Sequence, residues 1–592
     1  MILSDFIFKF LSEKGVDQVF MVTGGQAMFL DDAVYKNKKM KYVCTHHEQT
    51  AGMAADAYGR IKNKPAVALI TAGPGAVNVI NGVVGGWTDS SPMIILSGQS
   101  NLSYVEYQEK TGIRQYGVQG INIKPLVENV VKYFVTVDNP ENILYYLEKA
   151  YHLATSGRPG PVWIDVPVDM QRVEVADGYL RGFDEYSKKE IVETGTINKI
   201  IELLNRSKRP IVLAGQGVRL SGGAEEFIQL IKKMNIPVLT SRLGIDLINS
   251  DNKLYVGRPG TYGERAANFA IQNSDLILAI GCRLATPLIG HDAKDFGRRA
   301  KKIVIDIDQK ELDKPGLEID LKVKADANDF IKELMKSLGN VSLPDYNKWI
   351  EQCNYWKEKY PVVLPDYKNE KPVNSYYFTD KLSQMATKND LILLDTGSCF
   401  HVVCQAWKVK EGQKFLTTGG LSSMGYWAAG IGACEANDRK RTIVITGDGS
   451  LQMNLQEFAT IKHNNLPIKV FVFNNNGYLL IRHTQNNFMD GRLIGEGPST
   501  GVWCPDSVKI AEAYGIHAVR IDSVAGIEEK IKEVLEYNGP VICDVMTPEL
   551  QLLIPRVASD KMPDGSLVSR PYEDMFPFLS KEELQSNVIK DS

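Results

Sequence analysis

The chain has 592 residues, more than the roughly 250–300 residues at which a single hydrophobic core stops growing. Its formal net charge is -3, and basic and acidic residues are mixed without long blocks of one sign. These features exclude a single core and a charged surface for nucleic acid or an anionic membrane. We expect several domains, with a small molecule or a second copy of the chain as the partner.

The N-terminus, MILSDFIFKFLSEKGVDQVF, mixes apolar and charged side chains at helical spacing, unlike the basic start and apolar block of a secretory signal. No apolar run of about 18 residues occurs, so no membrane span is expected. The cysteines are scattered, without a CxxC pair or a zinc-like cluster. The sequence therefore predicts a reduced, cytoplasmic protein.

Apolar stretches typical of buried strands recur along the chain and end in glycine-rich turns. In chain order they are PAVALITAG (65–73), PIVLAGQG (210–217), SDLILAIGCR (274–283), KKIVIDID (301–308), DLILLDTGS (390–398) and TIVITGDG (442–449). Helical stretches separate them, which predicts an α/β fold of parallel sheets covered on both faces. Polar joints near 175–195 and 338–375 suggest domains at 1–175, 190–338 and 370–550, and a tail at 551–592.

The stretch from Thr442 to Tyr478 places a carboxylate and a carboxamide where two predicted strands end. TIVIT and IKVFVF are the strands, and Ser450 is expected to cap the helix between them. The apolar face of that helix is Leu451, Leu455, Phe458 and Ile461. A right-handed crossover makes the strands parallel, so Asp448 and Asn475 should converge at one sheet edge.

A carboxylate, a carboxamide oxygen and a backbone carbonyl from the Gly477 turn suit magnesium better than zinc. The backbone N–H groups of Gly449 and Ser450 would face the phosphates that such an ion binds. A GDG alone is also an ordinary turn, and only its combination with the strand, the helix and the asparagines makes the motif specific.

This GDG with its following asparagines resembles the diphosphate and metal motif of thiamine diphosphate enzymes. HHEQTAGMAADAYGR (46–60), TAGPGAVNVINGVVGGWTDSSPMIILSGQ (71–99) and TTGGLSSMGYWAAGIGA (417–433) resemble further segments of these enzymes. The resemblance covers nearly the whole chain and is nearest to the acetohydroxyacid synthase (acetolactate synthase) branch. It implies three doubly wound parallel-sheet domains, which bind the cofactor's pyrimidine (N-terminal), resemble a dinucleotide fold (central) and bind the diphosphate (C-terminal).

By this resemblance, Glu48 hydrogen-bonds the aminopyrimidine ring, and Met424 props the cofactor in its bent shape. Taken alone, Glu48 would be better explained as a first-turn glutamate favoured by the helix dipole, and Met424 as a core methionine; only the combination with the GDG segment favours the cofactor roles. The resemblance makes Asp448, Asn475 and Gly477 the Mg²⁺ ligands. The other implied cofactor contacts are Gly24, Gly25, Asn78, Thr396, Gly397, Ser398, Gly449, Ser450 and Tyr478. It also implies a homodimer or homotetramer with active sites at the subunit interface.

The sequence departs from acetolactate synthases on the substrate side of the cofactor. The family's Pro-Gly-Gly-Ala ends in Gln26 here, and Val118 replaces a phenylalanine before the retained Gln119. Val168 replaces a lysine, and Thr484 replaces a tryptophan. The changes should make the pocket larger and less suited to a carboxylate-bearing acceptor. The resemblance also places Leu480 and His483 in the pocket, and Gln26, Arg482, His483 and Gln485 could bind a hydroxylated acceptor.

The central segments PIVLAGQGVRL, GRPGTYGERAANFA and IVIDIDQKEL resemble the flavin-holding domain of acetolactate synthase. Gly215 and Gly217 form a weak dinucleotide signal, and Asp306 could bind a ribose. LATPLIG after GCR lacks the acidic pair of flavin-binding relatives, so FAD stays an open alternative. The tail segment 553–584 resembles the endings of thiamine diphosphate proteins of surface-sugar gene clusters.

The leading hypothesis is decarboxylation of a 2-oxoacid, pyruvate first, with transfer of the acyl unit to a carbonyl acceptor such as a keto-sugar. Alternatives are an acetolactate synthase of branched-chain amino-acid synthesis, a non-ligating decarboxylase, and a silent binding or regulatory subunit. The intact Glu48, Asp448 and Asn475 argue against the silent subunit.

Overall fold

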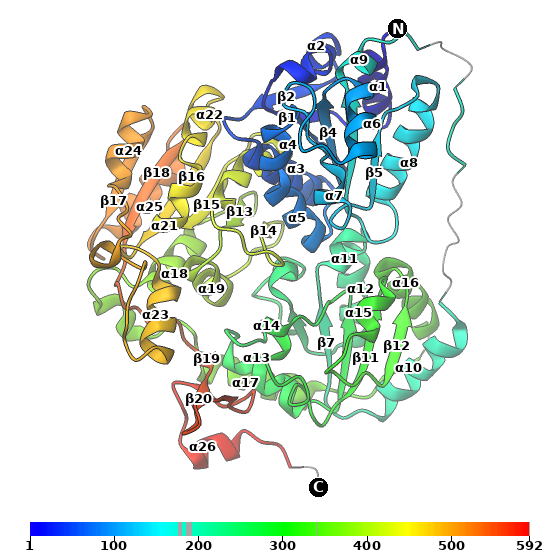
Figure 1. Cartoon of the computed structure of the whole chain (residues 1–592). Coiled ribbons are helices and arrows are strands. Elements are labelled where there is room, and N and C mark those ends of the chain that lie inside the picture. Colours follow the sequence, from blue (N-terminus) through cyan, green and yellow to red (C-terminus); the bar gives the residue numbers. More distant parts are fainter. Residues whose placement is uncertain (176–179, 185–191, 340, 591–592) are drawn as a thin grey trace.

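The computed structural model describes residues 1–175, 180–184, 192–339 and 341–590, so the joint predicted near 175–195 lies partly outside them. Each of three six-stranded sheets consists of parallel strands with helices on both faces (Figure 1). In Figure 1 the N-terminal sheet is blue to cyan, the central sheet green, and the C-terminal sheet yellow to orange. The predicted α/β fold with three doubly wound parallel sheets is therefore confirmed.

The N-terminal sheet has the strand order β2-β1-β3-β4-β6-β5. Its strands are β1 (Gln18–Met21), β2 (Lys41–Cys44), β3 (Ala66–Ile70), β4 (Met93–Gln99), β5 (Tyr133–Thr136) and β6 (Pro161–Pro167). Its helices are α1 (Leu3–Glu13), η1 (Gly25–Ala27), α2 (Met28–Lys36), α3 (Glu48–Lys62), α4 (Pro74–Asn78), α5 (Ile80–Asp89), α6 (Leu102–Thr111), α7 (Lys124–Val127), η2 (Pro140–Asn142), α8 (Ile143–Thr155) and α9 (Val168–Gln171). The strand order reverses between β1 and β3, and such a switch point is where doubly wound sheets bind ligands.

The C-terminal sheet repeats this pattern as β14-β13-β15-β16-β18-β17, with its switch point between β13 and β15. Its strands are β13 (Leu391–Leu394), β14 (Lys414–Thr417), β15 (Thr442–Gly447), β16 (Ile468–Asn474), β17 (His517–Ile521) and β18 (Val541–Met546). Its helices are η4 (Pro365–Asn369), α18 (Ser375–Met385), α19 (Ser398–Ala406), η5 (Tyr426–Ala429), α20 (Gly430–Ala436), α21 (Asp448–Leu451), η6 (Gln452–Asn454), α22 (Glu457–His463), α23 (Leu479–Phe488), η7 (Pro498–Thr500), α24 (Ser507–Ala513) and α25 (Ile527–Glu536).

The central sheet has a different order, β12-β11-β10-β7-β8-β9, which is the arrangement of dinucleotide-binding folds. Its strands are β7 (Pro210–Ala214), β8 (Val238–Thr240), β9 (Tyr255–Gly257), β10 (Leu276–Ile280), β11 (Lys301–Asp306) and β12 (Leu321–Lys324). Its helices are α10 (Thr194–Arg206), α11 (Gly217–Leu220), α12 (Ala224–Met234), η3 (Arg242–Gly244), α13 (Arg265–Asn273), α14 (Thr286–Ile289), α15 (Gln309–Asp313) and α16 (Ala327–Leu338).

Two segments outside the predicted sheets pack onto the central domain. The joint predicted near 338–375 contains α17 (Asn347–Lys359), whose Trp349 and Trp356 lie in the central core. The tail, red in Figure 1, lies beside α13 and α17 and adds Tyr572 to the same core. It contains β19 (Arg556–Val557), β20 (Ser559–Lys561), β21 (Leu567–Ser569), β22 (Met575–Phe576) and α26 (Lys581–Ser586). The tail therefore covers a face of the central domain.

The N-terminal and C-terminal domains share one hydrophobic core across α3 and α20. The two helices approach so closely that a Cβ on Gly432 would lie 2.0 Å from the Ala54 carbonyl oxygen. Arg60 is buried at this contact, 3.3 Å from Asp89, and donates to the Thr417 carbonyl at 2.9 Å. These contacts fix the two domains relative to each other.

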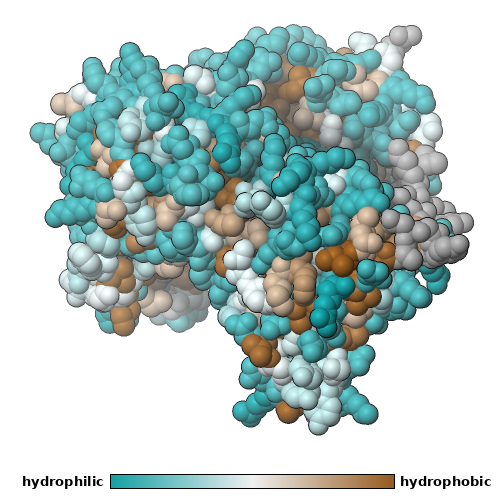
Figure 2. Space-filling model, turned by 90° about the horizontal axis from the view of Figure 1, so that it is seen from above, coloured by the Kyte–Doolittle hydropathy of each residue, from teal (hydrophilic) through white to brown (hydrophobic). Residues whose placement is uncertain are grey.

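The face in Figure 2 is mostly hydrophilic, and its hydrophobic residues form small separate patches. In the part of the chain that the structure describes, no helix has both the length and the apolar character needed to cross a bilayer.

Candidate active site

Asp448 and Asn475 directly follow β15 and β16, which are neighbouring parallel strands. Gly447 pairs with Phe473 across this ladder, so the two side chains start from adjacent points of one sheet edge. Both are buried, with 1% and 3% of their surface exposed. The strand-helix-strand arrangement thus brings the carboxylate and the carboxamide together.

The two side chains each keep one buried oxygen without a donor. Asp448 Oδ2 accepts the Gly477 N–H at 2.8 Å. Asp448 Oδ1 and Asn475 Oδ1 have no hydrogen-bond partner among the described residues. An unsatisfied buried polar atom costs about 1–3 kcal/mol, and burial raises the pKa of Asp448 to about 6. The donor set fits Mg²⁺, which prefers carboxylate and carbonyl oxygens.

Two glycines allow the backbone to close around these oxygens. Gly477 has a φ of +131°, and a Cβ there would lie 2.1 Å from the Glu496 carbonyl oxygen. A Cβ on Gly449 would lie 2.2 Å from the ring of Tyr478. Both clashes involve groups held by the fold, so the GDG turn and the Gly477 turn each require glycine.

The structure corrects the expected role of Ser450 as the helix cap. Gly447 occupies the cap position of α21, and the predicted helix is divided into α21, η6 and α22. Ser450 lies inside α21, where its hydroxyl donates to Asp395 at 2.6 Å and accepts the Gly425 N–H at 2.7 Å. The serine was misread because a local pattern does not reveal a buried partner far away in sequence.

Asp395 is a residue that the sequence reading missed. It is fully buried and accepts hydrogen bonds from the Thr446 hydroxyl at 2.8 Å, the Thr396 N–H at 2.8 Å and the Tyr426 N–H at 3.1 Å, besides Ser450. Burial raises its pKa to about 6. Asp395 thus ties the ends of β13 and β15 to the loop before η5. Its position at a strand end was the available signal.

The predicted diphosphate contacts Thr396, Gly397 and Ser398 form the turn between β13 and α19. Gly397 has a φ of +100°, and Ser398 begins α19. The first N–H groups of a helix lack intrahelical acceptors, and they suit phosphate oxygens. This turn and Asp448 lie at the ends of adjacent strands, β13 and β15, so both belong to the switch point.

Met424 is half-buried on a loop whose backbone is held directly after it. The next residue, Gly425, has a φ of +84° and donates its N–H to Ser450. The Gly425 carbonyl accepts from Asn454 Nδ2 at 2.9 Å. The backbone at Met424 is therefore held by the GDG helix itself.

Glu48 is the first residue of α3, as predicted. His47 caps the helix by accepting the Gln49 N–H at 3.1 Å. Glu48 Oε2 accepts from Asn78 Nδ2 at 3.0 Å, and a Cβ on Gly75 would lie 3.3 Å from Oε1. The structure therefore brings together two predicted cofactor residues, Glu48 and Asn78.

In the described part of this chain, no hydrogen bond or ion pair joins the Glu48 and Asn78 pair to Asp448 or Asn475. Gly24 lies in the loop after β1 and Gly25 begins η1, and a Cβ on Gly24 would lie 2.4 Å from Thr71. The predicted cofactor residues form two groups, one at each switch point.

The predicted substrate residues of the N-terminal domain share one sheet edge. Gln26 follows β1 in η1, Val168 follows β6 and is half-buried, and Val118 is 70% exposed in the loop between α6 and α7. Gln119 has a φ of +58°, and its carbonyl packs so closely that a Cβ on Gly73 would lie 2.6 Å away. The loop is thus seated beside the turn that begins α4.

The remaining substrate candidates, Leu480, His483 and Thr484, lie on α23. Leu480 packs against the C-terminal core, and exposed Thr484 donates to the Leu480 carbonyl at 2.9 Å. Burial lowers the pKa of His483, and its Nε2 has no partner among the described residues. Among these three residues, His483 therefore keeps a ring nitrogen that can still form a hydrogen bond.

Arg482 and Gln485, in contrast, are not free to bind an acceptor. Arg482 is buried, forms an ion pair with Glu496, and donates to the Asn475 carbonyl at 3.1 Å. Gln485 bonds the Ile494 backbone through both ends of its amide, at 2.8 Å and 3.0 Å. The expectation for both residues is corrected: they hold the loop that follows α23.

A cavity of about 510 Å³ lies at the switch point of the central sheet, and all three domains line it. Gly215 and Gly217 allow the loops after β7 and β10 to touch there, since a Cβ on Gly215 would lie 2.2 Å from the Gly281 carbonyl oxygen. Asp306 is buried at the end of β11, and burial raises its pKa. The described lining includes Thr396 and Gly420 of the C-terminal domain.

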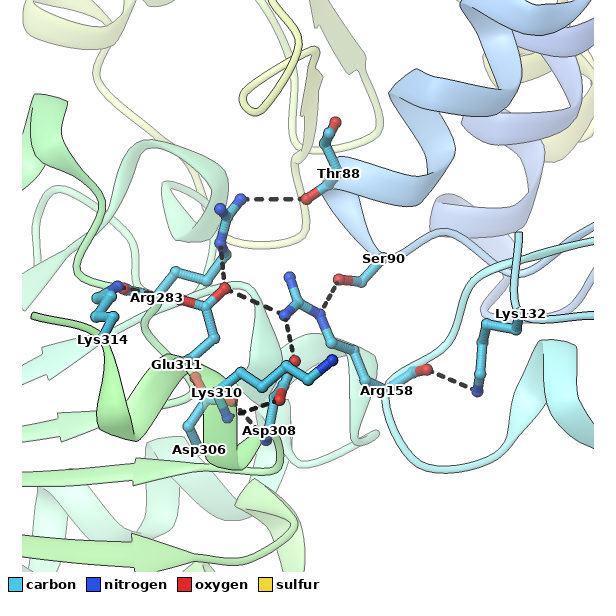
Figure 3. A network of polar contacts seen from close by, with 10 residues as sticks. All are labelled: Thr88, Ser90, Lys132, Arg158, Arg283, Asp306, Asp308, Lys310, Glu311 and Lys314. Carbon is cyan, nitrogen blue, oxygen red and sulfur yellow. Dashed lines mark hydrogen bonds and ion pairs between the residues drawn. The ribbon is translucent and has the colours of Figure 1, made fainter. Parts of the chain in front are cut away.

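Ion pairs connect two domains beside this cavity (Figure 3). Arg158 of the N-terminal domain lies 2.9 Å from Asp308 and 3.1 Å from Glu311 of the central domain. Arg283 binds Glu311 at 2.9 Å and donates to the Thr88 carbonyl at 3.1 Å. Both arginines also line the cavity, together with Asp89 and Asp306, so charged groups of both signs face this space.

Three protein-family models match the chain, one on each domain. They are described as the N-terminal TPP binding domain (residues 1–126), the central domain (197–334) and the C-terminal TPP binding domain (395–545) of thiamine pyrophosphate enzymes. Thiamine pyrophosphate, or TPP, is thiamine diphosphate. The two TPP-binding matches include the Glu48 and Asp448 groups.

Curated relatives match nearly the whole chain. The probable acetolactate synthase large subunit of Methanocaldococcus jannaschii is 33% identical over 92% of this chain and 92% of its own. The chloroplastic acetolactate synthase of Arabidopsis thaliana is 30% identical over 94% of this chain and 83% of its own. The large subunit of Lactococcus lactis is 29% identical over 94% of both. The chain therefore belongs to the thiamine pyrophosphate enzyme family, in its acetolactate synthase-like branch.

Proposed function

We propose that the enzyme decarboxylates a 2-oxoacid, with pyruvate as the expected donor, and transfers the acyl unit to a carbonyl acceptor. The observation that carries this proposal is the pair of unsatisfied buried oxygens, Asp448 Oδ1 and Asn475 Oδ1, at the switch point of a TPP-binding domain. A binding subunit without chemistry would gain nothing from two unpaired polar atoms in its core.

We assign Mg²⁺ to Asp448, Asn475 and the Gly477 backbone carbonyl, where it would hold the diphosphate. Thiamine diphosphate supplies a nucleophilic carbon and an electron sink when it is bound. Glu48 would bind the aminopyrimidine and exchange a proton with its ring nitrogen. Asn78, which donates to Glu48 Oε2, would keep this carboxylate oriented.

We also propose a homodimer or a homotetramer. Glu48 and Asp448 belong to separate groups within one chain, so a complete site would take its pyrimidine group from one subunit and its diphosphate group from another. Size determination of the purified protein, with and without cofactor, tests this assignment. A monomer that is fully active would contradict it.

The acceptor is proposed to be bulky and hydroxylated, such as a keto-sugar. Val118 and Thr484 are exposed where relatives carry rings, and Val168 offers no charge to a carboxylate. His483 Nε2 would supply a hydrogen bond to a hydroxyl group. The second candidate is acetolactate synthesis itself, which the names of relatives matching over 90% of the chain favour.

The test uses carbon-13 pyruvate with 2-oxobutyrate or with a keto-sugar nucleotide, and identifies the products. The proposal expects faster pyruvate consumption with the sugar, and a smaller preference in the double variant Val168→Lys, Thr484→Trp. Efficient acetolactate formation that no sugar alters would establish the second candidate. Labelled acetaldehyde alone in every mixture would exclude both.

FAD is proposed as the occupant of the central cavity. The dinucleotide strand order, the contact between Gly217 and Gly281 at the switch point, and the arginines Arg158 and Arg283 support a dinucleotide there. The absorption spectrum of the purified protein and titration with FAD test it. A colourless protein that binds no added FAD would remove flavin from the proposal.

A further inference from the structure

A buried carboxyl group outside the cofactor site is connected to the substrate-side loop. Asp165 lies near the end of β6, only 2% exposed. Its Oδ1 accepts from the Ser97 hydroxyl at 2.5 Å, and its Oδ2 accepts from Gln99 Nε2 at 3.1 Å. The Ser97 oxygen accepts from Trp163 Nε1 at 2.7 Å. Asp165 is therefore satisfied entirely by side chains of β4, with no basic partner among the described ion pairs.

Gln99 transmits this contact to the loop between α6 and α7. Its Nε2 also donates to the Ile121 carbonyl at 3.0 Å, and its Oε1 accepts the Ser100 N–H at 2.9 Å. The amide thus uses both of its N–H groups and its oxygen. Ile121 lies two residues after Gln119, so this carbonyl is an anchor of the segment that carries Val118 and Gln119.

The backbone of this loop is closely packed on two sides. A Cβ on Gly120 would lie 2.1 Å from the Tyr116 carbonyl oxygen and 2.8 Å from Ser100 Oγ. On its other side, the Gln119 carbonyl packs against Gly73, which begins the turn into α4.

We propose that Asp165 is a positioning residue that, through Gln99, holds the substrate-side loop in place for acceptor capture. Asp165 and Gln99 touch neither Glu48 nor the metal ligands, and Val118 and Gln119 do not bind Asp165 directly. Loss of the anchor should leave donor decarboxylation intact and let the acyl unit leave as aldehyde. This inference rests on the proposed carboligation, since only a ligase can lose acceptor capture.

Gln99→Met keeps the length of the side chain and removes the bond to the Ile121 carbonyl. With carbon-13 pyruvate and 2-oxobutyrate or a keto-sugar nucleotide, the ratio of ligated product to acetaldehyde should fall about tenfold, because small misplacements cost that much or more. Affinity for thiamine diphosphate should stay unchanged. Gln413→Met is the matched control: Gln413 is a buried glutamine that bonds Trp407 and the Thr387 carbonyl, far along the chain in the C-terminal domain.

A double-mutant cycle tests whether Asp165 acts through Gln99. Asp165→Leu introduced into the wild type should lower the ratio of ligated product to acetaldehyde. The same substitution introduced into Gln99→Met should change that ratio little further. Asp165→Asn, whose carbonyl oxygen can still accept from Gln99, should keep most of the wild-type ratio. If Asp165→Leu fails to fold, Asp165→Ala takes its place.

Additive effects, an unchanged ratio in Gln99→Met, or loss of cofactor affinity in that variant would each overturn the inference. A wild type that releases only acetaldehyde would instead refute the proposed carboligation, so the two failures are distinguishable.

Discussion

At the scale of single residues, the site is defined by what Asp448 and Asn475 lack. Their free oxygens are buried, whereas both carboxylate oxygens of the neighbouring Asp395 accept hydrogen bonds. Because a cation would compensate both oxygens at once, each should contribute to cofactor retention more than to the stability of the protein without cofactor.

Asp448→Asn and Asn475→Ala should therefore raise the concentration of Mg²⁺ and thiamine diphosphate needed for half-maximal binding by at least about tenfold, or 1.4 kcal/mol. The matched control is Asn476→Gly, since Asn476 is exposed, has a φ of +60° that glycine accepts, and bonds Glu549 instead. Calorimetric titration at limiting Mg²⁺ measures the change. Equal affinities in all three variants would show that the oxygens hold no metal.

Glu48→Gln should keep thiamine diphosphate affinity within a few fold and lose at least about 100-fold in turnover, since an amide cannot take up the proton. The comparison is the double variant Glu48→Gln, Gln49→Glu, which moves the carboxylate by one position without restoring Glu48. Pyruvate consumption at saturating cofactor is the measurement. Turnover near the wild-type rate in Glu48→Gln would remove this residue from the mechanism.

Asp165 should also make stability depend on pH. Burial raises its pKa to about 7, with hydrogen bonds from Ser97 and Gln99 lowering it and the charge of Glu109 raising it. The folded state then binds a proton that the unfolded state, with the ordinary value of 3.8, has released. The stabilisation is therefore complete below about pH 4 and is lost as the pH rises to about 7.

Asp165→Asn lacks this titrating carboxyl group. The thermal midpoint of the wild type minus that of the variant should therefore fall between pH 5 and 7, and it should be constant above about pH 8. Midpoints measured at several pH values in one salt concentration test this. Curves for the two proteins that stay parallel across this range would mean that Asp165 is charged in the fold.

At the scale of elements, the turns after strands were harder to predict than the strands. The apolar runs around β7, β10 and β15 predicted buried strands, because burial on both faces leaves a continuous signal in the sequence. The division of one predicted helix into α21, η6 and α22 left no such signal. Ser450, inside α21, instead bonds both Asp395 and Gly425, which come from other parts of the chain.

The same limit explains the substrate side of the site. Arg482 looked free in the sequence, whereas Glu496 and three backbone carbonyls use its guanidinium in the fold. A local motif shows which side chain is present but not which distant group it meets. The proximity of the predicted metal ligands Asp448 and Asn475 could be read from the sequence, because neighbouring parallel strands end at one sheet edge.

The Gly477 turn gives a prediction at this scale. Gly477→Ala would push a Cβ to 2.1 Å from the Glu496 carbonyl, so the turn must move and the N–H bond to Asp448 should be lost. Gly495→Ala is the control, since Gly495 also has a positive φ, of +61°, but open space around its Cβ position. Both should lose about 1–3 kcal/mol of stability from backbone strain, and only Gly477→Ala should also lose cofactor. Retained cofactor affinity in Gly477→Ala would contradict this reading.

At the scale of the whole molecule, the N-terminal and C-terminal sheets have one topology and the central sheet another. The two like sheets carry the predicted cofactor residues near equivalent switch points, β1/β3 and β13/β15. Their shared core across α3 and α20 fixes them together, while ion pairs of Arg158 and Arg283 attach the central domain. The N-terminal and C-terminal domains thus share a hydrophobic core, and the central domain is joined to them by these ion pairs and by Ile245, which packs in the C-terminal core.

The tail should contribute directly to the stability of that third domain. Asn587 is buried, accepts from Trp356 Nε1 at 2.8 Å, and accepts from Asn273 Nδ2 through its carbonyl. Asn587→Ala leaves the Trp356 N–H unpaired and should cost about 1–3 kcal/mol. The neighbouring Ser586→Ala, which loses one exposed hydrogen bond, should be near neutral. Thermal unfolding followed by tryptophan fluorescence distinguishes them, and equal midpoints would mean that the tail is not a stabilising part of the domain.

The position of the tail also has a consequence for how the protein is made. Domains generally fold in the order in which they leave the ribosome, yet the central domain receives Tyr572 and Asn587 from a segment that is made after the whole C-terminal domain. Until that segment has been synthesised, Trp356 and its apolar neighbours lack their cover, although the strands of the central domain emerged long before. A premature stop codon shortly before the tail would therefore yield chains that contain every predicted cofactor residue but expose part of the central hydrophobic core, and quality-control proteases would remove such chains.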